Sequence, residues 1–302
     1  MIKRLVSLGS VIVDLVLEVP RLPDRGGDVL ASQRGMAAGG AFNVLSAAAR
    51  LGLPGIYAGP HGTGPFGDLV RAALAREGVP TTMPPNPDLD TGWTLALVEP
   101  DGERTFVTVT GADALVTPAA LRPTEYRGGD AVYVSGYDLA YPGAGAAIAE
   151  HVAGLAPELT VVLDPGPLAA DIETGRLASV MRRVDILTLN ARELGALGGL
   201  NTVLGQVRPT ATVILRQGPD GATIHGAESR PVSVPSVSVK AVDTSGAGDV
   251  HVGASLAGLA RGLGWANAVL LGNRAAAYAV SRPGPAAGPT DDQLQEFGAS
   301  RW

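Results

Sequence analysis

Residues 243–254 read DTSGAGDVHVGA and place two carboxylates, two hydroxyl side chains and three small residues within seven positions. The preceding residues are β-like, and the small, apolar residues that follow predict a helix. The small residues Gly246–Gly248 allow a sharp turn and a close approach of backbone to a ligand, and Thr244 and Ser245 can cap the helix. The free amides of such a helix start favour an anion, such as a phosphoryl group during transfer.

Asp249 lies in the first turn of this predicted helix. A carboxylate beside an anion site does not suit simple phosphate binding, but it has a role if it takes a proton from a hydroxyl that attacks phosphorus. The alternative is that Asp249 only stabilises the helix N-terminus, where acidic residues are common. Both interpretations are open on these twelve residues.

The composition excludes several classes of protein. The 302 residues suit one large α/β domain or two ordinary ones, and 46% hydrophobic with 17% charged residues argues against disorder. The net charge of -6 argues against nucleic acid or an anionic membrane as the main partner. The chain has no cysteine, which excludes thiolate catalysis and Cys-based metal sites. Asp14 interrupts the apolar N-terminal run, and no uninterrupted 18-residue apolar stretch exists, so we expect a cytoplasmic protein without a membrane span.

Short apolar runs alternate with alanine-rich segments of helical length along most of the chain. The predicted strands are 4–9, 55–60, 131–136, 160–165, 184–190 and 211–218, and the predicted helices are 41–52, 66–77, 143–155, 175–183 and 191–198. This alternation predicts an α/β fold with a central, mostly parallel sheet flanked by helices. Residues 246–281 predict two more helices, broken near 262–264.

Two segments, about 13–35 and 91–109, predict strands without intervening helices, and EPDGER at 99–104 is a hairpin signal. We expect them to form a small β-sheet lid within a single domain that spans residues 1–302. The exposed face of a lid sheet often pairs with a second copy, so a homodimer through the lid is expected.

Residues 243–254 resemble the C-terminal signature of the PfkB, or ribokinase-like, family of carbohydrate and nucleoside kinases. The departures are His251 and Ala254, where an aromatic residue and Gly are usual. GGAFNVLSAAARLG at 39–52 resembles the family's other signature, although alone it could be a plain helix start. The resemblance implies a ribokinase-like fold and an ATP-dependent kinase that phosphorylates a hydroxyl of a small sugar or sugar acid. A nucleoside kinase of the same family is the alternative.

The resemblance also implies roles for residues far apart in the sequence. It implies that Asp249 is the catalytic base and that Gly246, Ala247 and Gly248 form an anion hole. The residues that it implies for binding the acceptor are Asp14, Gly39, Gly40, Asn43 and Arg104. The residues that it implies for binding the nucleotide are Asn190, Glu193, Gly218, Gly221, Thr244 and Asn273. Glu193 would help to hold Mg²⁺ through water, and backbone carbonyls of Asp243 and Ser245 could bind K⁺. Trp93, Phe106 and Tyr137 are further candidates for specificity. Without a ligand, Asn190 and Glu193 would form a capping box, and residues 216–221 would be a plain turn.

GTGPFG at 62–67 matches the Gly-x-Gly-x-x-Gly pattern of dinucleotide-binding turns, with Asp88 and Asp90 further along the chain. A dinucleotide-binding protein is therefore an alternative from a different class, as is a non-catalytic regulator that binds sugar or nucleotide on the same fold. A P-loop kinase is excluded because its Gly-x-x-x-x-Gly-Lys-[Ser/Thr] motif does not occur. The four histidines lack the spacing of metal ligands, and we expect His251 to pack internally.

Overall fold

The computed structural model describes residues 1–226, 230–284 and 288–299. Its larger sheet has eight strands in the order β12-β11-β10-β9-β8-β7-β1-β4. The strands from β4 to β10 in this order run parallel, whereas β11 and β12 are antiparallel additions at one edge. The bounds are β1 Arg4–Ser7, β4 Gly55–Tyr57, β7 Asp130–Ser135, β8 Thr160–Asp164, β9 Ile186–Asn190, β10 Thr212–Arg216, β11 Ala222–His225 and β12 Val232–Val234.

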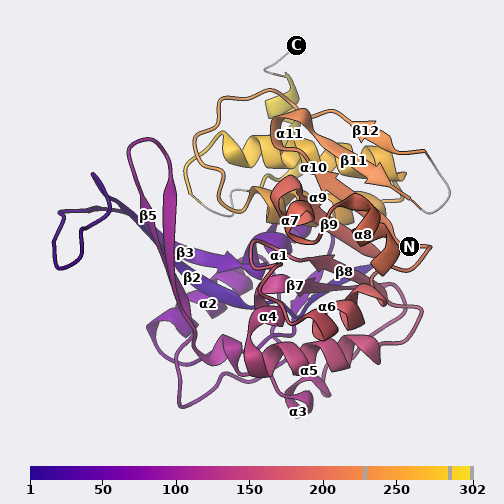
Figure 1. Cartoon of the computed structure of the whole chain (residues 1–302), viewed down its shortest axis with the longest axis horizontal. Helices are drawn as coiled ribbons and strands as arrows, with labels where there is room; N and C mark the ends of the chain where they lie inside the picture. Colours follow the sequence, from indigo (N-terminus) through magenta and orange to yellow (C-terminus); the bar gives the residue numbers. More distant parts are fainter. Residues whose placement is uncertain (227–229, 285–287, 300–302) are drawn as a thin grey trace.

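Helices cover both faces of this sheet, as the continuous apolar runs of its strands require. In Figure 1, α9 and α10 lie above the sheet and α5 and α6 lie below it. Leu5 packs in the core on the α1 and α9 side, and the next residue, Val6, packs in the core on the α5 and α6 side. The helices are α1 Ala41–Arg50, α2 Pro65–Arg76, α3 Pro118–Leu121, α4 Gly136–Ala140, α5 Pro142–Ala153, α6 Thr174–Met181, α7 Ala191–Ala196, α8 Leu200–Gln206, α9 Ala247–Ala260, α10 Trp265–Val280 and α11 Asp291–Ala299.

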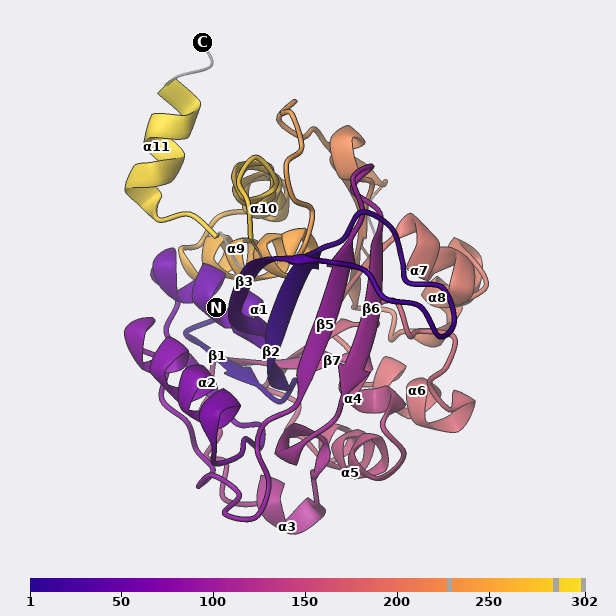
Figure 2. The same ribbon diagram turned by 90° about the vertical axis from the view of Figure 1, so that its left-hand side faces the viewer.

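The two segments predicted as strands without helices form a second sheet with the order β3-β2-β5-β6. It projects from the main body at the left of Figure 1, and its four strands lie side by side in Figure 2. The bounds are β2 Val11–Glu18, β3 Ser32–Gly40, β5 Trp93–Val98 and β6 Arg104–Val109. Because β3 runs into α1 without a break, it delivers Gly39 and Gly40 directly to the start of that helix.

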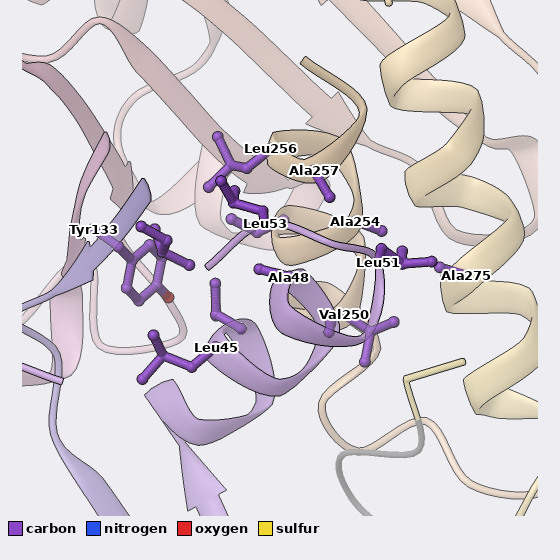
Figure 3. Close-up of a cluster of buried hydrophobic side chains, with 14 of the residues drawn as sticks. Leu45, Ala48, Leu51, Leu53, Tyr133, Val250, Ala254, Leu256, Ala257 and Ala275 are labelled. Atoms are coloured by element: carbon purple, nitrogen blue, oxygen red, sulfur yellow. The ribbon is translucent and has the colours of Figure 1, made fainter. Parts of the chain in front are cut away.

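Helices α1 and α9 pack closely through small side chains. Ala48 of α1 and Val250 and Ala254 of α9 belong to one buried cluster in Figure 3. A Cβ atom added to Gly253 of α9 would lie 2.4 Å from the carbonyl oxygen of Val44. This close approach holds the N-terminal ends of the two helices near each other, although they lie far apart in the sequence.

One local expectation differs from the structure. The residues before the Asp243 turn do not form a strand, and the chain from 235 to 246 lies outside helices and strands. His251 packs internally as predicted, with 3% of its surface exposed. Within the described residues, no helix is both long and apolar enough to cross a membrane.

Candidate active site

Asn43 of α1 and Asp249 of α9 meet at the point where these helices begin. Asn43 Nδ2 donates a hydrogen bond of 3.1 Å to Asp249 Oδ2. Burial, together with the negative charge of Asp164, raises the pKa of Asp249 to about 7, although Asn43 and Arg216 act in the opposite direction. A carboxyl group with a pKa near the operating pH is suited to accept a proton during catalysis.

Asp14 of β2 lies against Gly39 of the neighbouring strand. A Cβ atom at Gly39 would lie 2.0 Å from Asp14 Oδ2, so any larger residue here would displace the carboxylate. None of the described residues donates a hydrogen bond to the Asp14 carboxylate, and burial raises its pKa to about 6. A partly buried carboxylate without donors is costly unless a ligand supplies them, so Asp14 is suited to bind hydroxyl groups.

The turn before α9 has the conformation that its glycines allow. Gly246 is the residue before the helix, with φ 68° and ψ 6° in the left-handed region. No side chain caps this helix, so the expected capping by Thr244 and Ser245 is wrong. The amide of Ala247 donates to the carbonyl of Thr244 at 3.3 Å. The amides of Gly248 and Asp249 in the first turn of the helix have no capping side chain and are available to an anion.

Arg216, at the carboxyl end of β10, is the main charged residue that the sequence interpretation missed. Its Nη1 donates to Asp164 Oδ2 at 2.7 Å and to Thr188 Oγ1 at 2.9 Å, and its Nη2 lies 3.3 Å from Glu193 Oε2. Burial opposes its charge, but the carboxylates, Asp164 first, raise its pKa above the ordinary value. A Cβ atom at Gly248 would lie 3.3 Å from the Cζ of Arg216, so the guanidinium lies beside the turn before α9. Arg216 could have been found from the sequence, because it is a polar residue directly after the apolar run of a parallel strand, where ligands bind in α/β sheets.

Asn190 and Glu193 form the capping box that their spacing predicted. Asn190 Oδ1 accepts from the Glu193 amide at 2.9 Å, and Glu193 Oε2 accepts from the Asn190 amide at 2.7 Å. Burial, together with the charge of Asp164, raises the pKa of Glu193. The described residues contain no cluster of three or more metal-ligating side chains. The carboxylates of Glu193 and Asp164, at neighbouring strand ends, nevertheless fit Mg²⁺, which is commonly held by one or two carboxylates, water and substrate phosphates.

Arg104 of β6 reaches from the small sheet to the loop before α9. Its Nη2 donates to Asp243 Oδ1 at 2.6 Å, and its Nη1 donates to Thr244 Oγ1 at 3.1 Å. The amides of Ser245 and Gly284 also donate to the Asp243 carboxylate. Burial alone would raise the pKa of Asp243, but these hydrogen bonds and the charge of Arg104 lower it. Arg104 therefore ties β6 of the small sheet to the loop before α9.

The other residues predicted to bind nucleotide lie at the same edge of the sheet. Gly218 and Gly221 flank a short 3₁₀ turn between β10 and β11, and a Cβ atom at Gly221 would lie 2.1 Å from Val234 O. Asn273 of α10 is buried and donates to the carbonyls of Val234 and Pro235 at 3.1 and 3.0 Å. Its amide thus holds the end of β12 in place.

The Gly-x-Gly-x-x-Gly stretch binds a carboxylate of its own chain. The Asp90 carboxylate accepts hydrogen bonds from the amides of Phe66 and Gly67 at 3.1 and 2.7 Å. The Asp90 carboxylate therefore occupies the anion-binding position at the N-terminus of α2. The pyrophosphate of a dinucleotide would have to displace it.

A mostly parallel sheet with Asn43 and Asp249 at the starts of two adjoining helices is compatible with an α/β phosphotransferase, and comparisons with known proteins show the family. The family model described as pfkB family carbohydrate kinase matches residues 2–292. The chain is 36% identical over 297 residues to the "Uncharacterized sugar kinase YegV" of Escherichia coli, covering 95% of this chain and 91% of that protein. It is 30% identical over 306 residues to the "ATP-dependent ribose-1-phosphate kinase" of Halopiger xanaduensis, covering 99% of each.

The fold has a close match among solved structures. The ribokinase of Cryptococcus neoformans in complex with ADP superposes with a TM-score of 0.80 and 23% identity, covering 98% of this chain and 100% of that chain. The chain thus belongs to the pfkB family, and it is a carbohydrate kinase with the ribokinase-like fold. Membership implies that it uses ATP.

Gly39→Ala tests the placement of Asp14. The added Cβ would displace the Asp14 carboxylate, so we expect KM for the acceptor to rise at least tenfold, roughly the effect of a misplaced substrate contact, with KM for ATP little changed. Gly35→Ala on the same strand is the matched control, because a Cβ atom there meets nothing within 4 Å. Equal acceptor KM values for the two variants in steady-state assays would show that Asp14 does not need this space.

Proposed function

We propose that this carbohydrate kinase transfers the γ-phosphoryl group of ATP to a hydroxyl of a small sugar or sugar acid, with Asp249 as the general base. The observation that carries the proposal is the hydrogen bond of 3.1 Å from Asn43 to Asp249. It brings the two signature segments together beside the uncapped start of α9. Among the relatives of 30% identity or more, the Escherichia coli protein is named as a sugar kinase and a Klebsiella pneumoniae protein, 31% identical over 271 residues, as a fructokinase, which supports a sugar as the acceptor.

The proposed step follows from the chemistry of the residues present. The acceptor oxygen attacks the γ-phosphorus as the bond to the ADP oxygen breaks, and Asp249 takes the hydroxyl proton. The amides of Gly248 and Asp249 at the start of α9, together with the neighbouring Arg216, stabilise the charge on the transferring group. Asp14, Gly39, Gly40 and Asn43 orient the acceptor.

Metal ions complete the proposal. Asp164 and Glu193 would be the carboxylates that hold Mg²⁺, which would neutralise the charge of the phosphates. A potassium ion held by carbonyls of Asp243 and Ser245 remains a prediction from the resemblance. In this structure the charge of Asp243 is already balanced by Arg104.

We further propose that the small sheet is a lid and that its exposed face pairs with a second copy. Val107 and Val109 of β6 and Met36 of β3 lie on one face of this sheet and are 51%, 41% and 48% exposed. Apolar side chains gathered on one small sheet are typical of an interaction surface.

Release of ADP from Mg-ATP over a panel of sugars, sugar acids and nucleosides tests the function. We expect acceptor-dependent turnover that exceeds ATP hydrolysis without acceptor by at least about 100-fold, because a positioned hydroxyl replaces water. A nucleoside as the best acceptor would select the alternative kinase activity. ATP binding without turnover on any acceptor would instead indicate a non-catalytic regulator on the same fold.

A further inference from the structure

Arg104 and Asp14 lie on the same face of the small sheet. In the strand register, Arg104 of β6 pairs with Val98 of β5, which pairs with Glu18 of β2. Glu18 lies four residues beyond Asp14 on the same strand. Side chains an even number of residues apart along a strand point to the same side of a sheet. The face that carries the Asp14 carboxylate therefore also carries the guanidinium that reaches the loop before α9.

Arg104 also lies at the end of the sheet that is away from its attachment to the main body. At the attached end of β5 and β6, buried Asp113 accepts on Oδ1 from the amides of Gly92 and Gly111 at 2.6 and 3.0 Å. Gly92 precedes β5 and Gly111 follows β6, whereas Arg104 begins β6 beside the turn at 99–103. A rotation of the sheet about its attached end moves the far end most, so the contact made by Arg104 depends on the orientation of the whole sheet.

The loop that Arg104 contacts depends on side-chain bonds for its shape, because residues 235–246 lie outside helices and strands. The Asp243 carboxylate accepts from Arg104 Nη2 at 2.6 Å, and its side chain is 4% exposed. It also accepts from the amides of Ser245 and Gly284 at 2.9 and 3.2 Å. Without Arg104, this buried carboxylate would keep two amide donors but lose its cation, which is costly.

The same bonds hold the turn from which α9 begins. Arg104 Nη1 donates to Thr244 Oγ1 at 3.1 Å, so one guanidinium binds both residues before Ser245. The carbonyl of Thr244 accepts from the amide of Ala247, the first residue of α9. Asp249 is two residues further along this helix, and the placement of its carboxylate therefore depends on how the turn is held.

We infer that Arg104 is a positioning residue, which couples the orientation of the small sheet to the position of Asp249. The inference rests on the proposed roles of Asp14 and Asp249 in the kinase reaction. A sheet closed over an acceptor bound at Asp14 places Arg104 on Asp243 and Thr244, and the turn before α9 then holds the base in place. When the sheet opens, these bonds break and the turn is released, so the catalytic site is completed when the acceptor is enclosed.

Steady-state kinetics of Arg104→Gln with the best acceptor of the panel test the inference. The variant loses both contacts to the loop, so we expect kcat to fall about 10- to 100-fold, up to the cost of a displacement by about 1 Å. KM for the acceptor and KM for ATP should each change less than about threefold, because no contact proposed for either substrate is removed. A rise in acceptor KM with unchanged kcat would make Arg104 an acceptor contact and overturn the inference.

Three further variants separate positioning from stability. Arg104→Lys keeps the charge and one of the two bonds, so it should recover at least about threefold of the lost kcat. Asp243→Asn removes the charge that Arg104 binds, and its loss of kcat should not multiply with that of Arg104→Gln in the double variant. Arg21→Gln is the matched control and should keep kcat, because Arg21 pairs with Asp24 in the exposed loop between β2 and β3. Losses that multiply in the double variant would show that the two residues act separately, contrary to the inference.

Hydrogen exchange of the backbone amides in residues 243–249 tests the coupling without an assay of activity. In Arg104→Gln we expect these amides to exchange at least about tenfold faster than in the wild type, and in Arg21→Gln at the wild-type rate. Unchanged exchange in Arg104→Gln overturns the inference whatever the kcat of this variant. If no compound releases ADP, or if Asp249→Asn keeps wild-type kcat, the proposed function fails instead, and the exchange rates still decide whether Arg104 holds the turn.

Discussion

Asp249→Asn should lower kcat by at least about 100-fold, the low end of the effect expected for a general base. Asparagine has the same shape and can still accept the hydrogen bond that Asn43 donates. We therefore expect intact folding, checked by circular dichroism, and loss of ADP release measured with the best acceptor. Asp171→Asn is the matched control, because Asp171 is an exposed carboxylate far along the chain from the signature segments. Wild-type kcat in Asp249→Asn would contradict the assignment.

The raised pKa of Asp249 gives this substitution two further signatures. Folding raises the pKa from 3.8 to about 7, so the ionised group destabilises the fold progressively as the pH rises through this range. Removal of the charge should leave Tm at pH 8 unchanged or higher. In the wild type only the ionised form accepts a proton, so kcat/KM should rise about tenfold from pH 6 to pH 8. The residual kcat/KM of Asp249→Asn should not change with pH over the same range. If it still rises with pH, the pKa near 7 belongs to another group.

Arg216→Met should reduce both stability and activity. The substitution leaves Asp164 and Glu193 without their cation, and breaking a buried ion pair costs about 3–5 kcal/mol. It also removes a guanidinium beside the turn that receives the phosphoryl group, so we expect kcat to fall roughly 1000-fold, as when an arginine at a transferring phosphate is lost. Urea unfolding and steady-state kinetics measure the two losses separately.

Arg216→Lys keeps the charge and should fold, but a lysine lacks the fork that reaches three partners at once. We expect a smaller loss of stability than in the Met variant and a clear loss of kcat. Arg4→Met is the control, because Arg4 pairs with buried Asp130 at the amino ends of β1 and β7, away from the site. It should lose stability and keep kcat when assayed below its Tm. If both Arg216 variants keep kcat, Arg216 serves only the fold.

The part of the site that could be predicted from the sequence is the part contained in continuous signatures. Asp249 lies in a stretch whose chemistry is interpretable on its own, whereas the roles of Asp14, Gly39 and Asn43 were implied by a family resemblance. The structure places these four residues at the starts of α1 and α9 or on β2 and β3. The parallel strands and helices were predictable for the same reason, since apolar runs and alanine-rich segments carry local periodicity.

The ion pairs could not be predicted, because their partners come together only when the strands assemble. Arg216 meets Asp164 from 52 positions away and Arg104 meets Asp243 from 139 positions away. No local sequence pattern indicates which strand ends become neighbours in the folded sheet. The cap predicted for α9 was wrong because the Ser245 amide bonds to Asp243, and the turn then places Gly246 at the helix start.

The packing of α1 against α9 has a consequence for biosynthesis. The hydrogen bond between Asn43 and Asp249 joins residues 206 positions apart, so a ribosome makes α1 long before α9. Until α9 arrives, the apolar side of α1 that it covers has no partner, and exposed surface of this kind favours aggregation. Pairing at such long range is also slow to form, because the chain must first close a large loop. The newly made protein should therefore depend on chaperones during this interval, and catalytic competence should be among the last properties that it acquires.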